Sequence, residues 1–143
     1  MEAKETVARK LIVMKRCADY LRAKQSVTVR QLRDDYELRS AIERNFQVGI
    51  EAALDIAEVI ISEQGLEKPD DYRGAILTLG RKGVLPAGFA KRFAPAASFR
   101  DILVHGYAEV DLVRLHGYLV EELKDFDEFA RYVTEYLKRR ETI

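Results

Sequence analysis

Apolar residues recur every three or four positions along most of this 143-residue chain, which is the spacing that gives an α-helix one apolar face. No stretch alternates between apolar and polar residues for long enough to form a strand, and the one local candidate, residues 27–29, is too short to build a sheet. The connections between the periodic stretches are short, and short connections favour antiparallel neighbours. We therefore predict an all-α fold, an up-and-down antiparallel helical bundle of four to five main helices.

Capping residues, prolines and glycines bound the predicted helices. Thr28 and Gln31 have the spacing of a capping box for a short helical turn, and Gly65 is a natural end for the longest helix. Pro95 is expected to interrupt the helix that Pro86 begins. The predicted helices cover approximately residues 3–24, 38–64, 69–80, 86–105 and 112–137, the last with a break near residues 125–127.

The longest predicted helix carries a stripe of small residues, Gly49, Ala53 and Ala57. Small side chains let a neighbouring helix approach closely, and that neighbour can come from the same chain or from a second copy. The stripe is therefore compatible with a homodimer.

The composition is that of a folded, water-soluble domain. Hydrophobic residues make up 48% of the chain and charged residues 34%, which supplies both a core and a solvated surface. The length is close to the usual size of one domain, and we expect a single domain over residues 1–143. No run approaches the roughly 20 apolar residues that span a bilayer, and the first residues lack the apolar region of a secretory signal. We expect a cytoplasmic protein without membrane contact.

Few residues could hold a metal ion or carry redox chemistry. Cys17 is the only cysteine, and His105 and His116 are the only histidines. The phosphate-binding loop, the dinucleotide-binding glycine pattern, paired CxxC motifs and HExxH are absent. We therefore predict no metal and no cofactor. Cys17 lies on an apolar helical stripe and is interpreted as a buried residue, and His116 as a surface or core-edge imidazole.

The charges balance overall but are unevenly distributed. Lys and Arg number 24, as do Asp and Glu, yet residues 73–100 contain six basic residues and no acidic one. Such a segment can build a positive surface that suits phosphate groups. The alternative is that the six side chains point in different directions and only solvate their helices.

Residues 99–107 combine an arginine, a histidine and a tyrosine at the end of this basic segment. Arginine stays charged at physiological pH, and histidine is the side-chain type that titrates near neutrality. In a regular helix Arg100 and His105 lie about 140° apart, so both cannot face one small target. Either the helix ends at Gly106 and frees His105, or the groups converge with those of a second chain. The alternative is a buried Arg and His that only stabilise a helix end.

The segment from Arg100 to Tyr107 resembles the R-φ-xxx-H motif of the HEPN superfamily, in the R-x4-H-x-Y form of HepT-like toxins, with Asp101 at the polar position. Residues 41–57 are similar to the long second helix of that family, and residues 85–90 resemble its approach to the motif. The resemblance covers nearly the whole chain, and it implies a HEPN-like helical domain.

The resemblance also implies a metal-independent endoribonuclease that acts as the toxin of a HEPN/MNT-type toxin–antitoxin pair. Its active site would form where two motifs meet across a homodimer, with the 2′-hydroxyl of RNA as the nucleophile. His105 is expected to do acid/base work, Arg100 to bind the phosphate and Asp101 to orient either of them. Tyr107 is expected to contact the substrate, or to be AMPylated by the antitoxin, an MNT-type minimal nucleotidyltransferase. Candidate contacts to the RNA backbone are Arg81, Lys82, Lys91 and Arg92.

Two other functions remain open on the sequence alone. The chain can be a non-catalytic subunit that presents a nucleotide or Tyr107 to a nucleotidyltransferase partner, since HEPN domains include inactive members. It can also be a structural helical dimer in which the motif only caps a helix. RNA cleavage in EDTA that depends on His105 separates the enzyme from both.

Overall fold

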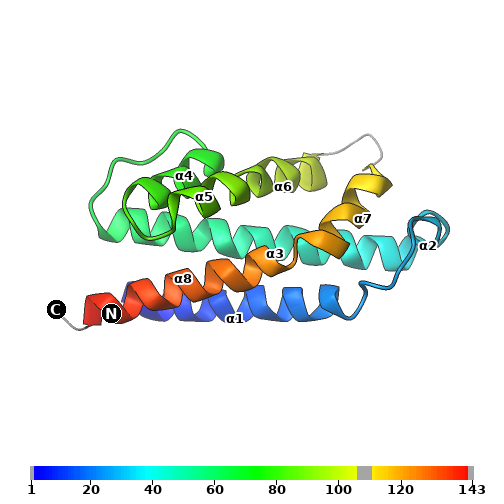
Figure 1. The fold of residues 1–143 in the computed structure, drawn as a ribbon, viewed down its shortest axis with the longest axis horizontal. Coiled ribbons are helices and arrows are strands. Elements are labelled where there is room, and N and C mark those ends of the chain that lie inside the picture. The colour runs from blue at the N-terminus through cyan, green and yellow to red at the C-terminus, as the bar shows by residue number, and fades with distance from the viewer. Residues whose placement is uncertain (1, 106–110, 142–143) are drawn as a thin grey trace.

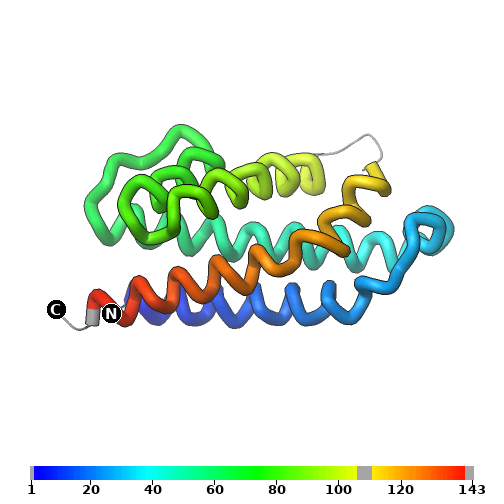
Figure 2. Tube along the Cα trace, in the orientation of Figure 1, coloured from blue at the N-terminus to red at the C-terminus, as the bar shows by residue number. Residues whose placement is uncertain are grey.

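The computed structural model describes residues 2–105 and 111–141, and within these ranges the chain forms helices and no strand, which confirms the predicted all-α class. The helices in chain order are α1 (Glu2–Arg22), α2 (Val29–Asp34), α3 (Tyr36–Glu63), α4 (Tyr72–Arg81), α5 (Ala87–Phe93), α6 (Pro95–His105), α7 (Leu112–Glu121) and α8 (Lys124–Glu141). In Figure 1, α3 runs along the molecule with α1 and α8 on one side and α4, α5 and α6 on the other. The trace in Figure 2 runs up and down along one long axis, as predicted for a bundle. None of the described helices is both long and apolar enough to cross a lipid bilayer.

Helix α3 is the longest of the described helices and lies at the centre of the bundle. Its 28 residues correspond to about 42 Å of helix axis. The Asp35 side chain caps the first turn by accepting a hydrogen bond from the backbone N–H of Leu38. Gly65 follows the helix with a φ of 67°, a left-handed conformation that favours glycine. The longest helix therefore ends where the sequence predicts.

Side-chain capping also sets the boundaries of shorter helices. Thr28 and Gln31 form both hydrogen bonds of the predicted capping box at the start of α2. Helix α4 begins slightly after its predicted start, because the Asp71 side chain accepts a hydrogen bond from the N–H of Gly74 and caps the helix there. Pro95 begins α6 and separates it from α5, as predicted.

The C-terminal third is divided into α7 and α8. Helix α7 ends at Glu121 and α8 begins at Lys124, so the break precedes its predicted position at residues 125–127. Leu123 in the break and Phe126 after it are both buried. The apolar spacing therefore continues through the break, which is why the sequence pattern does not locate it.

The small residues of α3 pack against helices of the same chain. A Cβ atom added to Gly49 would lie 3.2 Å from Cβ of Cys17 on α1 and 3.3 Å from Cζ of Phe126 on α8. Ala53 and Ala57 are fully buried. Cys17 is buried as interpreted, and this burial raises the pKa of its thiol. The stripe therefore serves packing within one chain.

His116 on α7 lies at the edge of the core, as predicted. Its Nε2 atom is 2.8 Å from the carbonyl oxygen of Val27. This hydrogen bond joins α7 to the segment that precedes α2, which gives the imidazole a structural role.

Candidate active site

Helix α6 carries the predicted motif, and Phe99 fixes its orientation. The Phe99 side chain is completely buried, and its ring stacks on Tyr118 of α7 with 4.2 Å between centroids. The same ring meets Phe46 of α3 in a T-shaped contact with 5.8 Å between centroids. Because Phe99 points into the core, the next residue, Arg100, emerges at the side of α6.

Groups from three helices hold the guanidinium of Arg100. Its Nε and Nη2 atoms donate hydrogen bonds to Oε2 of Glu51 on α3, at 3.0 and 2.8 Å. Its Nη1 atom donates to Oδ1 of Asp101 on α6 at 3.1 Å. The ring centroid of Tyr72, the first residue of α4, lies 5.5 Å from the Arg100 Cζ atom. The Arg100 side chain is 19% exposed, so it reaches the surface although most of it is enclosed.

These partners keep Arg100 charged. Burial alone would lower the pKa of Arg100, but hydrogen bonds and charges from Glu51 and Asp101 raise this pKa above its usual value. Two carboxylates face one guanidinium, so the group of three carries a net negative charge. Arg100 therefore meets a ligand as an oriented hydrogen-bond donor rather than as an unpaired positive charge.

His105 is the last residue of α6, and its side chain is exposed. The helix continues to this residue, so the step from Arg100 places His105 about 7.5 Å along the axis and about 140° around it. The structure therefore does not bring Arg100 and His105 together within one chain. The exposure of His105 contradicts the alternative in which both residues are buried to stabilise a helix end.

Asp101 connects the two faces of the motif. It lies one turn before His105 on the same face of α6, and it also accepts the hydrogen bond from Arg100. Its carboxylate therefore contacts one of the two groups that it was expected to orient, and the residue shares a helix face with the other. Gly106 and Tyr107, the predicted helix end and the predicted substrate contact or AMPylation site, lie outside the described residues.

The four residues predicted to contact the RNA backbone lie at the end of α4, just after it, and on α5. These elements lie near the start of α6, whereas His105 is at the end of α6 (Figure 1). Arg92 forms ion pairs with Asp125, at 3.4 Å, and with Glu128 of α8. Arg81 donates a hydrogen bond to a threonine of its own helix. The side chains of the two lysines are exposed. About 15 Å of α6 separates this basic group from His105. The four residues are Arg81, Lys82, Lys91 and Arg92.

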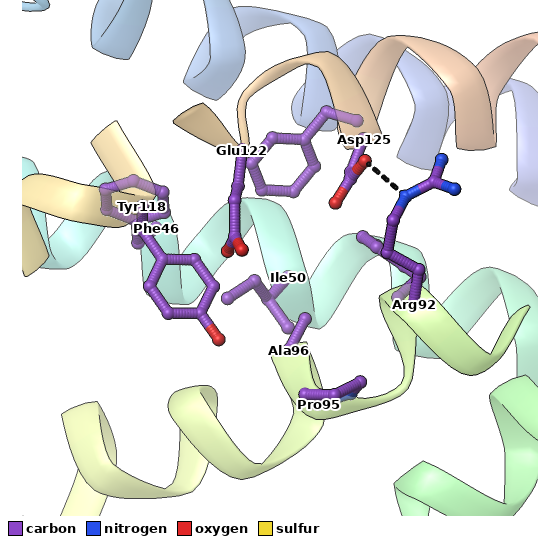
Figure 3. Close-up of a pocket in the computed structure, with 10 residues that line it drawn as sticks. Phe46, Ile50, Arg92, Pro95, Ala96, Tyr118, Glu122 and Asp125 are labelled. Carbon is purple, nitrogen blue, oxygen red and sulfur yellow. Dashed lines mark hydrogen bonds and ion pairs between the residues drawn. The ribbon is translucent and has the colours of Figure 1, made fainter. Parts of the chain in front are cut away.

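A hollow of about 100 Å³ lies between α3, the start of α6 and the α7–α8 connection (Figure 3). Mostly apolar side chains line it, with Glu122 and Asp125 on its polar side. Burial raises the pKa of both carboxyl groups, and Asp125 pairs with Arg92. The hollow meets α6 at Pro95, at the far end of that helix from His105, so it is separate from the motif. Within residues 2–105 and 111–141, no three His, Cys, Asp or Glu side chains lie close enough together to hold a metal ion.

Glu51 and Tyr72, which hold Arg100, are absent from the residues predicted on the sequence alone. Glu51 lies 49 residues before Arg100 in the chain, and Tyr72 begins a different helix. Charged residues occupy many outward positions of α3, so nothing local distinguishes Glu51 from its neighbours. Only the packing of α3 against α6 could identify it.

Comparison with known proteins shows the family to which this chain belongs. The family model described as "Ribonuclease HepT-like" matches residues 13–133, a range that contains the whole of the Arg100–Tyr107 motif. The chain belongs to the HepT-like ribonuclease family. This confirms the resemblance that the motif and its flanking segments indicate.

Individual relatives cover most of the chain. It is 26% identical over 128 residues to the tRNA nuclease HepT of Aphanizomenon flos-aquae, which covers 90% of this chain and 87% of that protein. It is 27% identical over 99 residues to the mRNA nuclease HepT of Shewanella oneidensis, covering 69% and 74%. The tri-AMPylated Shewanella oneidensis HEPN toxin, solved in complex with an MNT antitoxin, superposes with a TM-score of 0.82 over 91% of this chain and 97% of that chain, at 24% identity. That likeness shows a shared fold.

Proposed function

We propose that this protein is a metal-independent endoribonuclease and that it acts as the toxin of a HEPN/MNT-type toxin–antitoxin system. The observation that carries the proposal is an oriented Arg100 and an exposed His105 on one helix of a HepT-like family member. These residues supply an anion-binding group and an acid/base group, which are the groups that scission of an RNA phosphodiester requires. Two relatives that are named as nucleases support the same activity.

The proposed reaction uses the 2′-hydroxyl of the RNA as the nucleophile. One His105 imidazole takes the proton of this hydroxyl as its oxygen attacks the adjacent phosphorus atom. Arg100 donates hydrogen bonds to the phosphate oxygens as negative charge develops on them. The bond between phosphorus and the 5′-oxygen then breaks, and the same imidazole, now protonated, gives its proton to the leaving oxygen. The products are a 2′,3′-cyclic phosphate and a 5′-hydroxyl, and no step calls for a metal ion or a cofactor.

The geometry of α6 favours a site that two chains share. Arg100 and His105 face directions about 140° apart on one helix, so one phosphate cannot meet both in the same chain. Two copies related by a twofold axis can place Arg100 of one chain opposite His105 of the other. The exposed apolar side chains of Ile102, Val104 and Val113 lie within or shortly after the motif. We propose that the homodimer covers them.

We also propose an MNT-type nucleotidyltransferase antitoxin as a partner. The structural relative described as tri-AMPylated and bound to an MNT antitoxin supports this pairing. AMPylation of Tyr107 would add bulk and negative charge beside the motif and so repel an RNA phosphate. We propose that residues 1–143 form one domain and that it acts on RNA in the cytoplasm. The proposed contacts to the RNA backbone, farther along the molecule, are Arg81, Lys82, Lys91 and Arg92.

Digestion of RNA by the purified protein in EDTA tests the proposal. We expect the wild type to cut RNA and to leave 2′,3′-cyclic phosphate ends. Arg100→Ala and His105→Ala should each abolish cleavage while helix content and oligomeric state are retained. His116→Ala is the matched control, because the other histidine binds a backbone carbonyl in the fold and should not affect the chemistry.

Three results would contradict the proposal. The first is cleavage that requires an added metal ion, and the second is full activity in either motif variant. The third is tight binding to a nucleotidyltransferase with no RNA turnover, which would favour a non-catalytic partner subunit instead.

A further inference from the structure

We infer that Glu51 is a positioning residue, which holds the guanidinium of Arg100 so that the free N–H groups of that side chain face an RNA phosphate. The inference rests on the proposed function and adds to the site a residue from a different helix. It follows from the contacts of Arg100 rather than from the motif, since Glu51 lies 49 residues earlier in the chain.

The packing of α6 against α3 sets the position of Glu51 relative to Arg100. Phe46 on α3 is buried and contacts the ring of Phe99 on α6. Each member of the ion pair directly follows a buried residue, because Glu51 follows Ile50 and Arg100 follows Phe99. The pair therefore lies at the edge of a packed interface, where the neighbouring core residues hold both backbones in place.

The hydrogen-bond donors of Arg100 that remain unused define what a ligand can contact. A guanidinium has five N–H groups. Glu51 accepts one from Nε and one from Nη2, and Asp101 accepts one from Nη1. One N–H group remains on each terminal nitrogen, and two such donors match two oxygens of a phosphate. Glu51 occupies the Nε side of the guanidinium and leaves these terminal donors for the substrate.

The surroundings of the ion pair favour a fixed geometry. The side chains of Arg100 and Glu51 are 19% and 31% exposed, so both are partly shielded from water. The ring of Tyr72 lies against the guanidinium and restricts its movement on that side. A free arginine side chain samples many rotamers and loses that freedom when it binds a phosphate. Glu51 restricts Arg100 before RNA arrives, so less freedom is lost on binding.

Two other roles for Glu51 predict different outcomes. If Glu51 competed with the RNA phosphate for Arg100, removing its charge would raise activity. If the ion pair only stabilised the fold, its removal would lower stability and leave kcat of the folded protein unchanged. Positioning predicts a lower kcat with little change in KM, because Arg100 keeps its charge and loses its orientation.

Steady-state RNA cleavage by Glu51→Ala and Glu51→Gln tests this role. We expect Glu51→Ala to lower kcat by about 10- to 100-fold and to change KM by less than about threefold. Glu51→Gln keeps one acceptor oxygen for Arg100, so its loss should be smaller. Asp55→Asn is the matched control, because Asp55 lies one turn further along α3 and pairs with Lys10. This control should leave kcat unchanged, and circular dichroism at the assay temperature verifies that each variant is folded.

A double variant tests whether Glu51 acts through Arg100. If it does, adding Glu51→Ala to Arg100→Lys should lower kcat by less than about twofold further, since the planar guanidinium is already gone. An unchanged or higher kcat in folded Glu51→Ala would overturn the positioning role and leave the proposed function standing. Failure of the wild type to cut RNA would overturn the proposed function, and the positioning role would fall with it.

Discussion

Replacing Phe99 with alanine removes the side chain that anchors α6 in the bundle. The ring is completely buried, stacks on Tyr118 and meets Phe46 edge-on. Truncation of a buried phenylalanine costs about 3–5 kcal/mol, through lost transfer energy and the cavity left behind. Because two aromatic contacts disappear with the ring, we expect a loss of about 4–5 kcal/mol in the free energy of unfolding.

Urea unfolding followed by far-ultraviolet circular dichroism measures this loss. Ile12→Ala on α1 is the control, because that side chain is 55% exposed and lies on the other side of α3 from α6, so its truncation should change the free energy of unfolding by less than about 0.5 kcal/mol. A loss below about 2 kcal/mol in Phe99→Ala would show that the ring is not tightly packed and does not anchor α6. If Phe99→Ala does not fold, Phe99→Leu keeps most of the volume and should lose about 1–2 kcal/mol.

The same substitution should also affect the site. Arg100 directly follows Phe99, and its alignment with Glu51 depends on the position of α6. We expect kcat per folded molecule of Phe99→Leu to fall, whereas Ile12→Ala should keep the kcat of the wild type. An unchanged kcat in folded Phe99→Leu would contradict this link between packing and activity.

Further predictions concern packing and pH. Gly80→Ala should lower the free energy of unfolding by about 1–3 kcal/mol in a urea titration, since the added Cβ would lie 2.6 Å from Cβ of Ala90. Gly88→Ala, whose added Cβ meets no atom within 4 Å, should be neutral or stabilising, and an equal loss in both variants would contradict the close contact at Gly80. Glu122→Gln should raise stability at neutral pH. Burial and the charge of Asp125 raise the pKa of Glu122 above its usual 4.5. The folded protein therefore binds this proton more tightly than the unfolded chain does, and the free energy of unfolding falls as the pH rises through the raised pKa. The melting temperature of the variant relative to wild type should therefore increase from about pH 4 to pH 7, and a constant difference would contradict this.

The helical class and most helix ends could be predicted because their signals are local. The capping box of Thr28 and Gln31, the left-handed Gly65 and the helix-starting Pro95 each act within about one turn of the residue itself. The break between α7 and α8 has no glycine or proline, and Leu123 continues the apolar spacing through it. Tertiary packing decides the position of that break.

The motif of the candidate site could also be predicted, but its partners could not. Arg100 and His105 stand out by their residue types and their position at a helix end, and the resemblance to the HEPN motif gives their expected roles. Glu51 becomes visible only when α3 packs against α6. Similarly, counting charges along the chain shows a basic segment but does not show that Arg92 is paired with Asp125 of α8. Contacts between distant parts of the chain determine which charges are available to a ligand.

We propose that each active site takes Arg100 from one chain and His105 from the other. Co-expression of Arg100→Ala and His105→Ala chains with different affinity tags isolates dimers that carry one of each. Such a dimer keeps one intact pair across the interface and none within a chain. We expect the mixed dimer to cleave RNA in EDTA at about half the wild-type rate, because one of two symmetric sites is complete. Each variant alone should be inactive. A mixed dimer as inactive as its parents would contradict the shared site.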